Sequence, residues 1–319
     1  MTFVGFGDME AAMTGIAAFS HARVDLGALT LSVCRGGHGT PLILLHGFPQ
    51  NHMCWETVAP VLARHFDVIV PDLRGYGESD APADDPGHTV YSKRTMAADV
   101  VGLMDALGLE RAHILGHDRG ARVAYRLALD HPHRVDRLGI IEILPTLEYW
   151  EAFDAELGMA IYHWTFLAQP APLPERLIGH DPHFFIDHCL RNWTYHKTLD
   201  LFSPAALGSY RRQASDPLRL AAMCADYRAG ATTDRTLDAA DQKAGRLIDA
   251  PLHFLWAETG FPARAARSAQ AAGGAFDPAA TWRRWARNVT ASSCVSGHFV
   301  MEENPEAVLR AFLPHFGVV

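Results

Sequence analysis

The sequence AHILGHDRGAR at residues 112–122 contains the stretch that decides the fold. Two apolar residues, Ile114 and Leu115, predict the end of a buried strand, and apolar residues recur at helical spacing beyond the glycines. Between strand and helix, Gly116-His117-Asp118-Arg119-Gly120 places a glycine on each side of a central polar residue, which is the pattern of a nucleophile elbow. The glycines are needed because side chains at those two positions would collide with the strand and the helix.

The central residue of this stretch, Asp118, determines the predicted chemistry. An ionised aspartate is already a nucleophile at neutral pH and suits displacement at a saturated carbon that carries a leaving group. A serine would need a base first and would then attack a carbonyl. The aspartate product is an ester of the enzyme, which water must cleave. In the structural alternative, Asp118 only caps the following helix, since aspartate is a favoured N-cap residue.

The composition is that of a soluble globular protein of 319 residues, with 49% hydrophobic and 20% charged residues. Its net charge of −8 argues against nucleic acid or anionic membranes as partners. No apolar stretch reaches the ~20 residues of a membrane-spanning helix, and residues 1–19 carry Asp8 and Glu10 and do not predict a signal peptide. The odd number and wide spacing of the cysteines predict reduced, mostly buried thiols in a cytoplasmic protein. They are Cys34, Cys54, Cys189, Cys224 and Cys294.

Buried strands alternate with amphipathic helices along most of the chain, which predicts an α/β fold with a mostly parallel sheet flanked by helices. The clearest strands are expected at 42–45, 68–70, 138–143 and 252–256. Between 146 and 230 the strand-like runs disappear, and aromatic residues, histidines and prolines become dense. We therefore expect a core domain of residues 1–145 and 231–319 and an inserted helical cap domain of residues 146–230.

Six motifs spread along the chain resemble those of one known family. They are HGFPQ at 46–50, DLRGYGESD at 72–80, GHDRGAR at 116–122, YHWTF at 162–166, DYRAG at 226–230 and GHF at 297–299. Together they resemble the haloacetate (fluoroacetate) dehalogenases of the α/β-hydrolase superfamily. The resemblance implies an α/β-hydrolase fold with a helical cap, no cofactor, and a homodimer. It also implies the hydrolysis of short 2-haloacids such as chloroacetate or fluoroacetate to glycolate and halide.

The proposed base is His298, on the loop after the last strand, since a histidine can take a proton from water near neutral pH. The order nucleophile, acid, histidine along the chain is that of α/β-hydrolases. Glu142, at the end of a predicted strand, is the expected third member, although the family usually has aspartate there. The longer side chain must shift to hydrogen-bond His298 at ~2.6–3.2 Å. Glu258, after the next-to-last strand, is the alternative acid.

Two arginines follow the nucleophile, and Arg119 and Arg122 share a face of the predicted helix. Cations are unfavourable in the first turn of a helix unless negative charge lies close by. A substrate carboxylate would supply that charge through forked hydrogen bonds. In the family both arginines bind the carboxylate of the haloacid, whereas epoxide hydrolases and haloalkane dehalogenases usually have tryptophan at the position of Arg119. The alternative is a pair of surface salt bridges.

Three side chains of the cap, those of His163, Trp164 and Tyr227, match the halide-binding positions of the family. Each can donate a hydrogen bond to a departing halide. Trp193 matches an aromatic residue near the family's pocket. Without the resemblance, aromatic residues in a helical cap are more often packing residues.

The backbone N–H groups of Phe48 and Arg119 are the expected oxyanion hole when water attacks the ester. We expect no metal site, because the one tempting cluster has no familiar ligand spacing. That cluster is His180, Asp181, His183, Asp187 and His188.

Two other functions remain open. An epoxide hydrolase would use the same Asp118, with Tyr227 protonating the opening ring, but the arginine at 119 disfavours it. A non-catalytic ligand receptor on the same fold is the other alternative, because Glu142 is atypical.

Overall fold

The computed structural model describes residues 16–271, 273 and 277–318. Most of the segment for which we predict no signal peptide lies outside these ranges. Among the described helices, none is both long and apolar enough to cross a membrane. All five cysteines are free and buried, as predicted.

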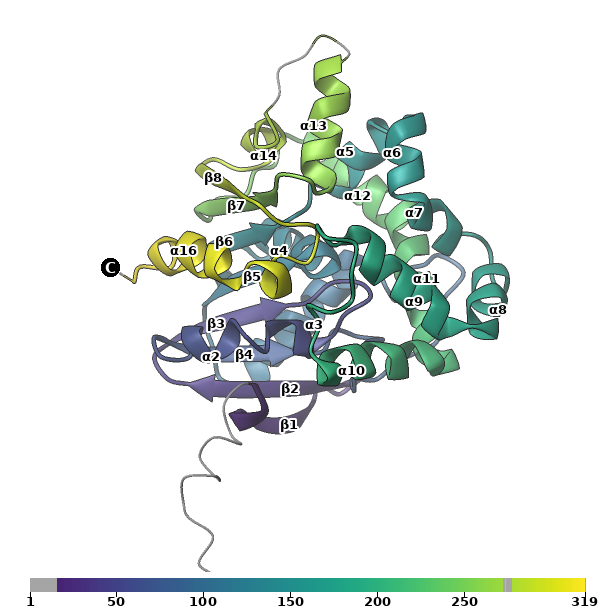
Figure 1. Cartoon of the computed structure of the whole chain (residues 1–319). Coiled ribbons are helices and arrows are strands. Elements are labelled where there is room, and N and C mark those ends of the chain that lie inside the picture. Colours follow the sequence, from purple (N-terminus) through teal and green to yellow (C-terminus); the bar gives the residue numbers. More distant parts are fainter. Residues whose placement is uncertain (1–15, 272, 274–276, 319) are drawn as a thin grey trace, which may run out of the picture.

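The described strands form one eight-stranded sheet in the order β1-β2-β4-β3-β5-β6-β7-β8 (Figure 1). The strands are β1 (Ser20–Asp25), β2 (Thr30–Gly37), β3 (Thr40–Leu45), β4 (Phe66–Pro71), β5 (Ala112–His117), β6 (Val135–Ile141), β7 (Leu252–Ala257) and β8 (Val289–Cys294). Strand β2 pairs antiparallel with β1 and β4, and all other pairs are parallel. Strands β4 and β5 are buried along their whole length, because helices cover both faces. The predicted α/β class is confirmed.

Core helices lie on both faces of this sheet, with α2 and α16 on one face and α3 and α4 on the other (Figure 1). The core helices are α2 (Ala59–Leu62), α3 (Lys93–Ala106), α4 (Asp118–Asp130), α13 (Phe261–Ala271), α14 (Ala280–Trp285), α15 (Val300–Glu303) and α16 (Pro305–His315). Three short 3₁₀ helices are also described, Ile16–Ala18, His52–Trp55 and Pro132–Arg134.

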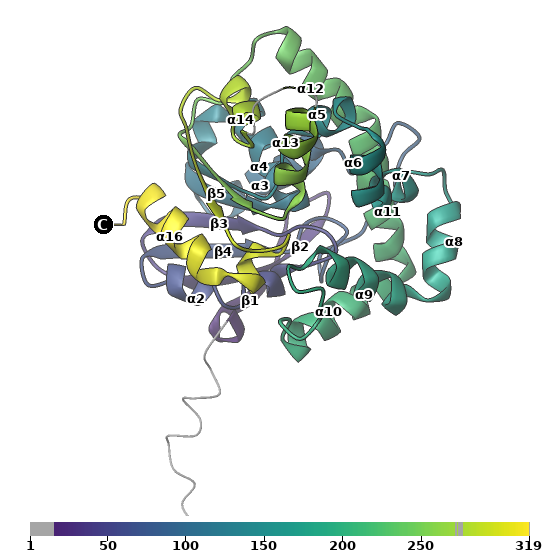
Figure 2. The ribbon, with the colours of Figure 1, turned by 45° about the horizontal axis from the view of Figure 1, so that its top comes forward.

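Only helices are described between β6 and β7, and Figure 2 shows α6–α11 gathered beside the sheet. The helices are α5 (Thr146–Glu151), α6 (Ala155–Ala160), α7 (Tyr162–Leu167), α8 (Leu173–His180), α9 (Pro182–Trp193), α10 (Pro204–Ser215), α11 (Pro217–Ala231) and α12 (Thr233–Lys243). Helices α9, α10 and α11 begin with a proline preceded by a capping Asp or Ser, whose oxygen accepts a backbone N–H of the first turn. These dipeptides explain why the insertion divides into short helices.

The side chain of Gln213 on α10 joins the segment 146–230 to two loops of the core. Its amide Nε2 donates to the carbonyl oxygens of Pro49 (2.5 Å) and Gln50 (3.1 Å), and its Oε1 accepts the N–H of Gly77 at 2.8 Å. A buried cap residue therefore holds the two core loops that flank the end of β3. We retain residues 146–230 as a proposed cap domain, with α12 contacting both domains.

The turn between β5 and α4 explains the two glycines of the elbow. A Cβ atom on Gly116 would lie 2.6 Å from the Cα of Ala121 in α4, and one on Gly120 would overlap the carbonyl oxygens of Leu45 and His46. The strand β3 and the helix α4 thus approach too closely for any other residue, as the sequence predicts.

Gly120→Ala should therefore lower the unfolding free energy by about 2–3 kcal/mol, since the new methyl group overlaps backbone that cannot move freely. The matched control is Gly102→Ala in α3, where the new Cβ would lie 3.6 Å from its nearest neighbour. That substitution should stabilise the helix by about 0.5–1 kcal/mol. Denaturant unfolding midpoints measure both, and equal midpoints would contradict this explanation of the elbow.

Candidate active site

Asp118 lies at the first residue of α4, with a backbone φ of +46°. This left-handed conformation is rare for a residue other than glycine, because it strains the backbone. Strained residues of this kind are frequent at functional sites. The residue is 7% exposed, and its Oδ1 accepts the backbone N–H of Phe48 at 2.9 Å. The turn therefore directs a carboxylate away from the strand end, with one expected oxyanion-hole donor already beside it.

Asp118 is an ionised group in a buried position. Burial alone raises the pKa of its carboxyl, but nearby positive charge outweighs burial, and the pKa lies below its ordinary value. The opposing contributions, largest first, come from His298, His117, Arg119 and Arg122. The carboxylate is thus available as a nucleophile at neutral pH.

His298 follows β8 and faces both acids expected around it. Its Nε2 lies 3.8 Å from Oδ2 of Asp118, and its Nδ1 lies 3.7 Å from Oε1 of Glu142. The loop is fixed by the His298 N–H, which donates to the carbonyl of Trp193 at 2.8 Å. The end of helix α9 therefore positions His298, the expected base.

Glu142 directly follows β6, also with positive φ (+61°), and is fully buried. Its two carboxylate oxygens accept the N–H groups of Ala257 (2.7 Å) and Phe261 (2.8 Å). Burial raises the pKa of this carboxyl, and these contacts and His298 oppose the rise. The separation of 3.7 Å from His298 is that of an ion pair and is longer than the expected hydrogen bond.

Glu258, the alternative acid, is exposed, and its Oε1 accepts the hydroxyl of Ser293 at 3.2 Å. It lies within neither hydrogen-bond nor ion-pair distance of any described histidine. The geometry therefore favours Glu142 as the acid that orients His298.

The two arginines after the nucleophile are both 1% exposed but have different partners. The guanidinium of Arg119 forms a two-pronged ion pair with Asp226, through Nε at 3.1 Å and Nη2 at 2.5 Å. The carboxylate of Asp226 also contacts the ammonium of Lys93 and accepts the hydroxyl of Tyr76 at 2.8 Å. Much of the charge of Arg119 is therefore already compensated within the protein.

Arg122 donates through Nη1 to the carbonyl of Leu144 (3.1 Å) and the hydroxyl of Thr146 (3.0 Å), both neutral groups. Its Nε has no hydrogen-bond partner among the described residues, and no carboxylate oxygen of theirs lies within 4.0 Å of the guanidinium. The guanidinium also lies 4.6 Å from the ring centre of Trp164. A buried cation with an unused donor is expected to attract an anion.

The aromatic residues predicted in the cap lie close to one another and to Phe48, whose N–H contacts Asp118. The ring of His163 is 4.3 Å from that of Trp193 and 5.5 Å from that of Tyr227, and Tyr227 contacts Phe48 at 5.2 Å. Trp164 lies 6.4 Å from Tyr227. The residues to which the resemblance assigns halide binding therefore lie close to one another.

Burial lowers the pKa of His163 to about 3, so its imidazole is neutral at pH 7 and carries one N–H. Its Nδ1 has no hydrogen-bond partner in the described part of the chain. One ring nitrogen of His163 can thus donate a hydrogen bond to a ligand. Because the ring is neutral, it adds no positive charge that would repel Arg119 and Arg122.

The network around Asp226 is the part of the site that the sequence did not predict. Asp226 immediately precedes Tyr227 in a helix of apolar residues, so an acid at that position was a usable signal for a buried ion pair. Lys93 gave no such signal, because it comes from the distant helix α3. Its Nζ also lies 3.6 Å from Oδ2 of Asp234 on α12.

The histidine-rich segment of the cap has other partners. Asp181 caps α9, Asp187 pairs with Arg211 at 2.6 Å, and His183 contacts Ser215. The described residues contain no group of three or more His, Cys, Asp or Glu side chains arranged to hold a metal ion.

Asp226→Asn should lower the unfolding free energy by about 3–5 kcal/mol, because it leaves two buried cations without their carboxylate. The double variant Lys93→Met/Asp226→Asn should recover part of that loss. The matched control is Asp249→Asn in the exposed pair with Arg287, which should cost less than about 1 kcal/mol. Denaturant unfolding measures all three, and equal losses in the two single variants would refute the buried network.

Comparison with known proteins gives a consistent result. The family model described as alpha/beta hydrolase fold matches residues 40–288. A fluoroacetate dehalogenase from Burkholderia sp. is 41% identical over 92% of this chain and 94% of its own length. A soluble epoxide hydrolase from Corynebacterium sp. (strain C12) is 32% identical over 93% and 97%.

Among solved structures, a putative alpha/beta hydrolase from Nostoc sp. PCC 7120 has a TM-score of 0.87 and 43% identity. The match covers 95% of this chain and 100% of that one. The chain therefore belongs to the α/β-hydrolases and, within them, to the family of the haloacetate dehalogenases that its motifs resemble.

Proposed function

We propose that this protein hydrolyses short 2-haloacids, converting a haloacetate and water to glycolate and halide through an ester on Asp118. The observation that carries the proposal is the pairing of an ionised Asp118 on a strained turn with a buried Arg122 that has no carboxylate partner among the described residues. A substrate that bears both a leaving group and a carboxylate satisfies both groups at once. No cofactor is required by this chemistry.

In the first step, an Asp118 oxygen attacks the carbon that bears the halogen and forms a C–O bond while the carbon–halogen bond breaks. The halide leaves with the bonding electrons toward the N–H and O–H groups of His163, Trp164 and Tyr227. The substrate carboxylate binds Nε of Arg122 and the part of the Arg119 guanidinium that Asp226 does not use. Alignment of this kind lowers the barrier by fixing the attack geometry in advance.

In the second step, water attacks the ester carbonyl carbon of Asp118, and His298 takes the proton that the water loses. The negative charge that develops on the carbonyl oxygen is stabilised by the N–H of Phe48, which already contacts this carboxylate at 2.9 Å, and by the N–H of Arg119. Glu142 stabilises the imidazolium. Collapse of the intermediate breaks the bond to the glycolate oxygen, which takes the proton back from His298, and the Asp118 carboxyl then ionises again as glycolate leaves.

An epoxide hydrolase is the second candidate. Its support is the similarity to the Corynebacterium enzyme and the position of Tyr227, whose ring lies 5.2 Å from that of Phe48 near the nucleophile. A neutral epoxide, however, would leave Arg122 buried without an anion. A receptor without catalysis is a weaker candidate, since it would have no use for a strained Asp118 beside His298. The homodimer and the cytoplasmic location remain predictions.

His298→Ala separates these candidates. Incubation with chloroacetate should give a protein heavier by one carboxymethyl group, and peptide mapping should locate the group on Asp118. Without the base, water is activated poorly, and turnover should fall by about 10²–10⁴. Intact-protein mass spectrometry measures the adduct, and halide release measures turnover.

Two controls accompany this experiment. His298→Ala/Asp118→Asn should show no adduct, and His183→Ala, which changes an exposed cap histidine, should turn over normally without accumulating ester. Wild-type protein that releases no halide, together with an unmodified His298→Ala variant, would reject the dehalogenase. Conversion of a small epoxide to its diol under the same conditions would then favour the second candidate.

A further inference from the structure

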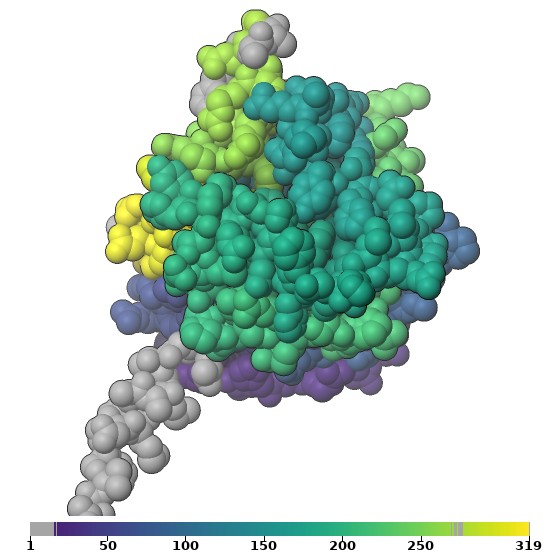
Figure 3. Space-filling view, turned by 45° about the vertical axis from the view of Figure 1, so that its right-hand side comes forward, coloured from purple at the N-terminus to yellow at the C-terminus, as the bar shows by residue number. Residues whose placement is uncertain are grey.

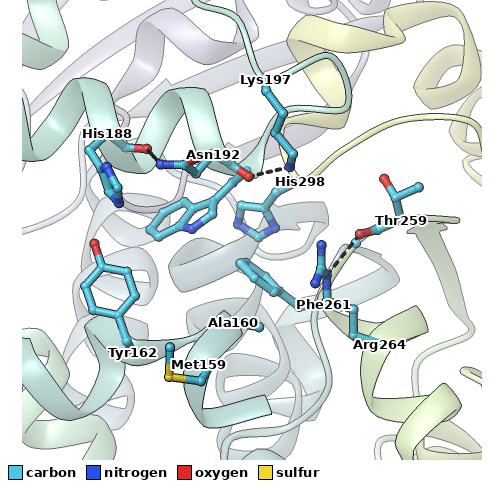
Figure 4. Close-up of a pocket in the computed structure, with 12 residues that line it drawn as sticks. Met159, Ala160, Tyr162, His188, Asn192, Lys197, Thr259, Phe261, Arg264 and His298 are labelled. Carbon is cyan, nitrogen blue, oxygen red and sulfur yellow. Dashed lines mark hydrogen bonds between the residues drawn. The ribbon is translucent and has the colours of Figure 1, made fainter. Parts of the chain in front are cut away.

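A surface pocket with a volume of about 430 Å³ lies where cap helices α6, α7 and α9 meet the start of α13. Figure 3 shows the face on which these segments meet, and Figure 4 shows the side chains around the pocket. Its lining residues are Met159, Ala160, Tyr162, His188, Asn192, Trp193, Lys197, Thr259, Gly260, Phe261, Arg264 and His298. None of the sequence motifs assigns a function to most of them.

The floor of this pocket is the outer wall of the active site. His298 lines the pocket, and its Nε2 is 3.8 Å from the carboxylate of Asp118. The rings of Phe261 and Trp193 lie 4.7 and 5.9 Å from that of His298, and Trp193 in turn contacts His163. His298 is therefore shared by the pocket and the candidate active site, and the rings of Phe261 and Trp193 lie beside it.

Two cations line the pocket, and both are held by backbone carbonyl oxygens. The Nζ of Lys197 donates to the carbonyl of Asn192 at 2.5 Å, and Nε of Arg264 donates to that of Thr259 at 3.3 Å. Within residues 16–271, 273 and 277–318, no carboxylate oxygen lies within 4.0 Å of either cation. These charges are thus fixed in place without being neutralised.

The two cations also repel each other. Partial burial and the charge of Arg264 lower the pKa of Lys197, while Glu303 opposes the change. The carboxylate of Glu303 is already occupied by the backbone N–H groups of Tyr195 (2.6 Å) and Gly297 (3.1 Å). Lys197 moreover has a left-handed backbone, with φ of +55°. An anion between Lys197 and Arg264 would relieve the repulsion that the fold otherwise maintains.

We propose that this pocket is an outer binding site for small anions, formed by Lys197 and Arg264, through which anionic ligands pass to and from Asp118. The chain as a whole carries a net charge of −8 and repels anions at long range. The positive charges of Lys197 and Arg264 make the electrostatic potential at the pocket positive, so that an anion is attracted there despite the net negative charge of the chain. The identification of the anion as a haloacid entering, or a halide leaving, rests on the proposed function; the anion site itself does not.

Charge reversal tests the site by kinetics. In Lys197→Glu/Arg264→Glu, kcat/KM for chloroacetate should fall about tenfold at ~0.01 M salt, because steering is lost, and the difference should shrink toward ~1 M salt. The matched control, Arg235→Glu/Lys243→Glu on α12, changes the net charge equally at exposed positions away from the pocket. In this control, kcat/KM should fall by less than about threefold, which is half of the tenfold effect on a logarithmic scale. Equal falls in kcat/KM in the two variants would overturn the proposal.

The same variant distinguishes the two anions. A loss that appears in KM, with kcat retained at saturating chloroacetate, assigns the site to the entering carboxylate. A loss in kcat together with slower bromide release, measured by stopped flow with bromoacetate, assigns it to the departing halide. Kinetics identical to those of the α12 control in both assays would refute either role.

Bromide binding tests the site without any turnover. Crystals of the wild-type protein soaked in sodium bromide should show an anomalous peak between Nζ of Lys197 and the guanidinium of Arg264. The peak should be lost in Lys197→Met/Arg264→Met. If wild-type protein releases no halide from chloroacetate, the proposed function fails while a bromide peak still supports the anion site; the lack of a wild-type peak overturns the site itself.

Discussion

A buried carboxylate that must stay ionised is the constraint on which the rest of this structure depends. Asp118 is held at a strained turn, where burial opposes its charge, and the surrounding cations restore it. The backbone of Phe48 donates to it and the imidazole of His298 faces it. Three features keep this one negative charge accessible at the edge of the sheet. They are the glycines of the elbow, the two arginines of α4 and the loop that carries His298.

Arg119 and Arg122 are buried cations, and each needs a negative or hydrogen-bond-accepting partner to offset the cost of its burial. Asp226 from the cap compensates Arg119, and Lys93 adds positive charge to the same carboxylate. Arg122, in contrast, donates only to neutral oxygens within the described chain and lies against the ring of Trp164. The segment 146–230 therefore does more than cover the core: Asp226 holds the guanidinium of Arg119, while Nε of Arg122 has no hydrogen-bond partner among the described residues.

The sequence predicted the sheet and the elbow because both depend on local patterns, namely apolar runs and paired glycines. The side chains expected around Asp118 came from the resemblance to the haloacetate dehalogenases, and the structure places the rings of His163, Trp193 and Tyr227 beside one another. The Asp226–Lys93 pair was missed, since it joins α11 to α3 across more than one hundred residues and leaves no periodic signal. The distance of 3.7 Å between Glu142 and His298 depends on how the N–H groups of Ala257 and Phe261 hold the acid, which the pattern cannot specify.

The most direct measurement of the central claim is the fate of water oxygen in a single turnover. Enzyme in excess over chloroacetate, in water enriched with oxygen-18, should give glycolate whose hydroxyl oxygen is unlabelled, because that oxygen comes from the Asp118 carboxylate. Peptide mapping should then find the label in the side chain of Asp118. Label in the hydroxyl of the first-turnover glycolate, with none in Asp118, would mean that water attacks the substrate directly and would contradict the account.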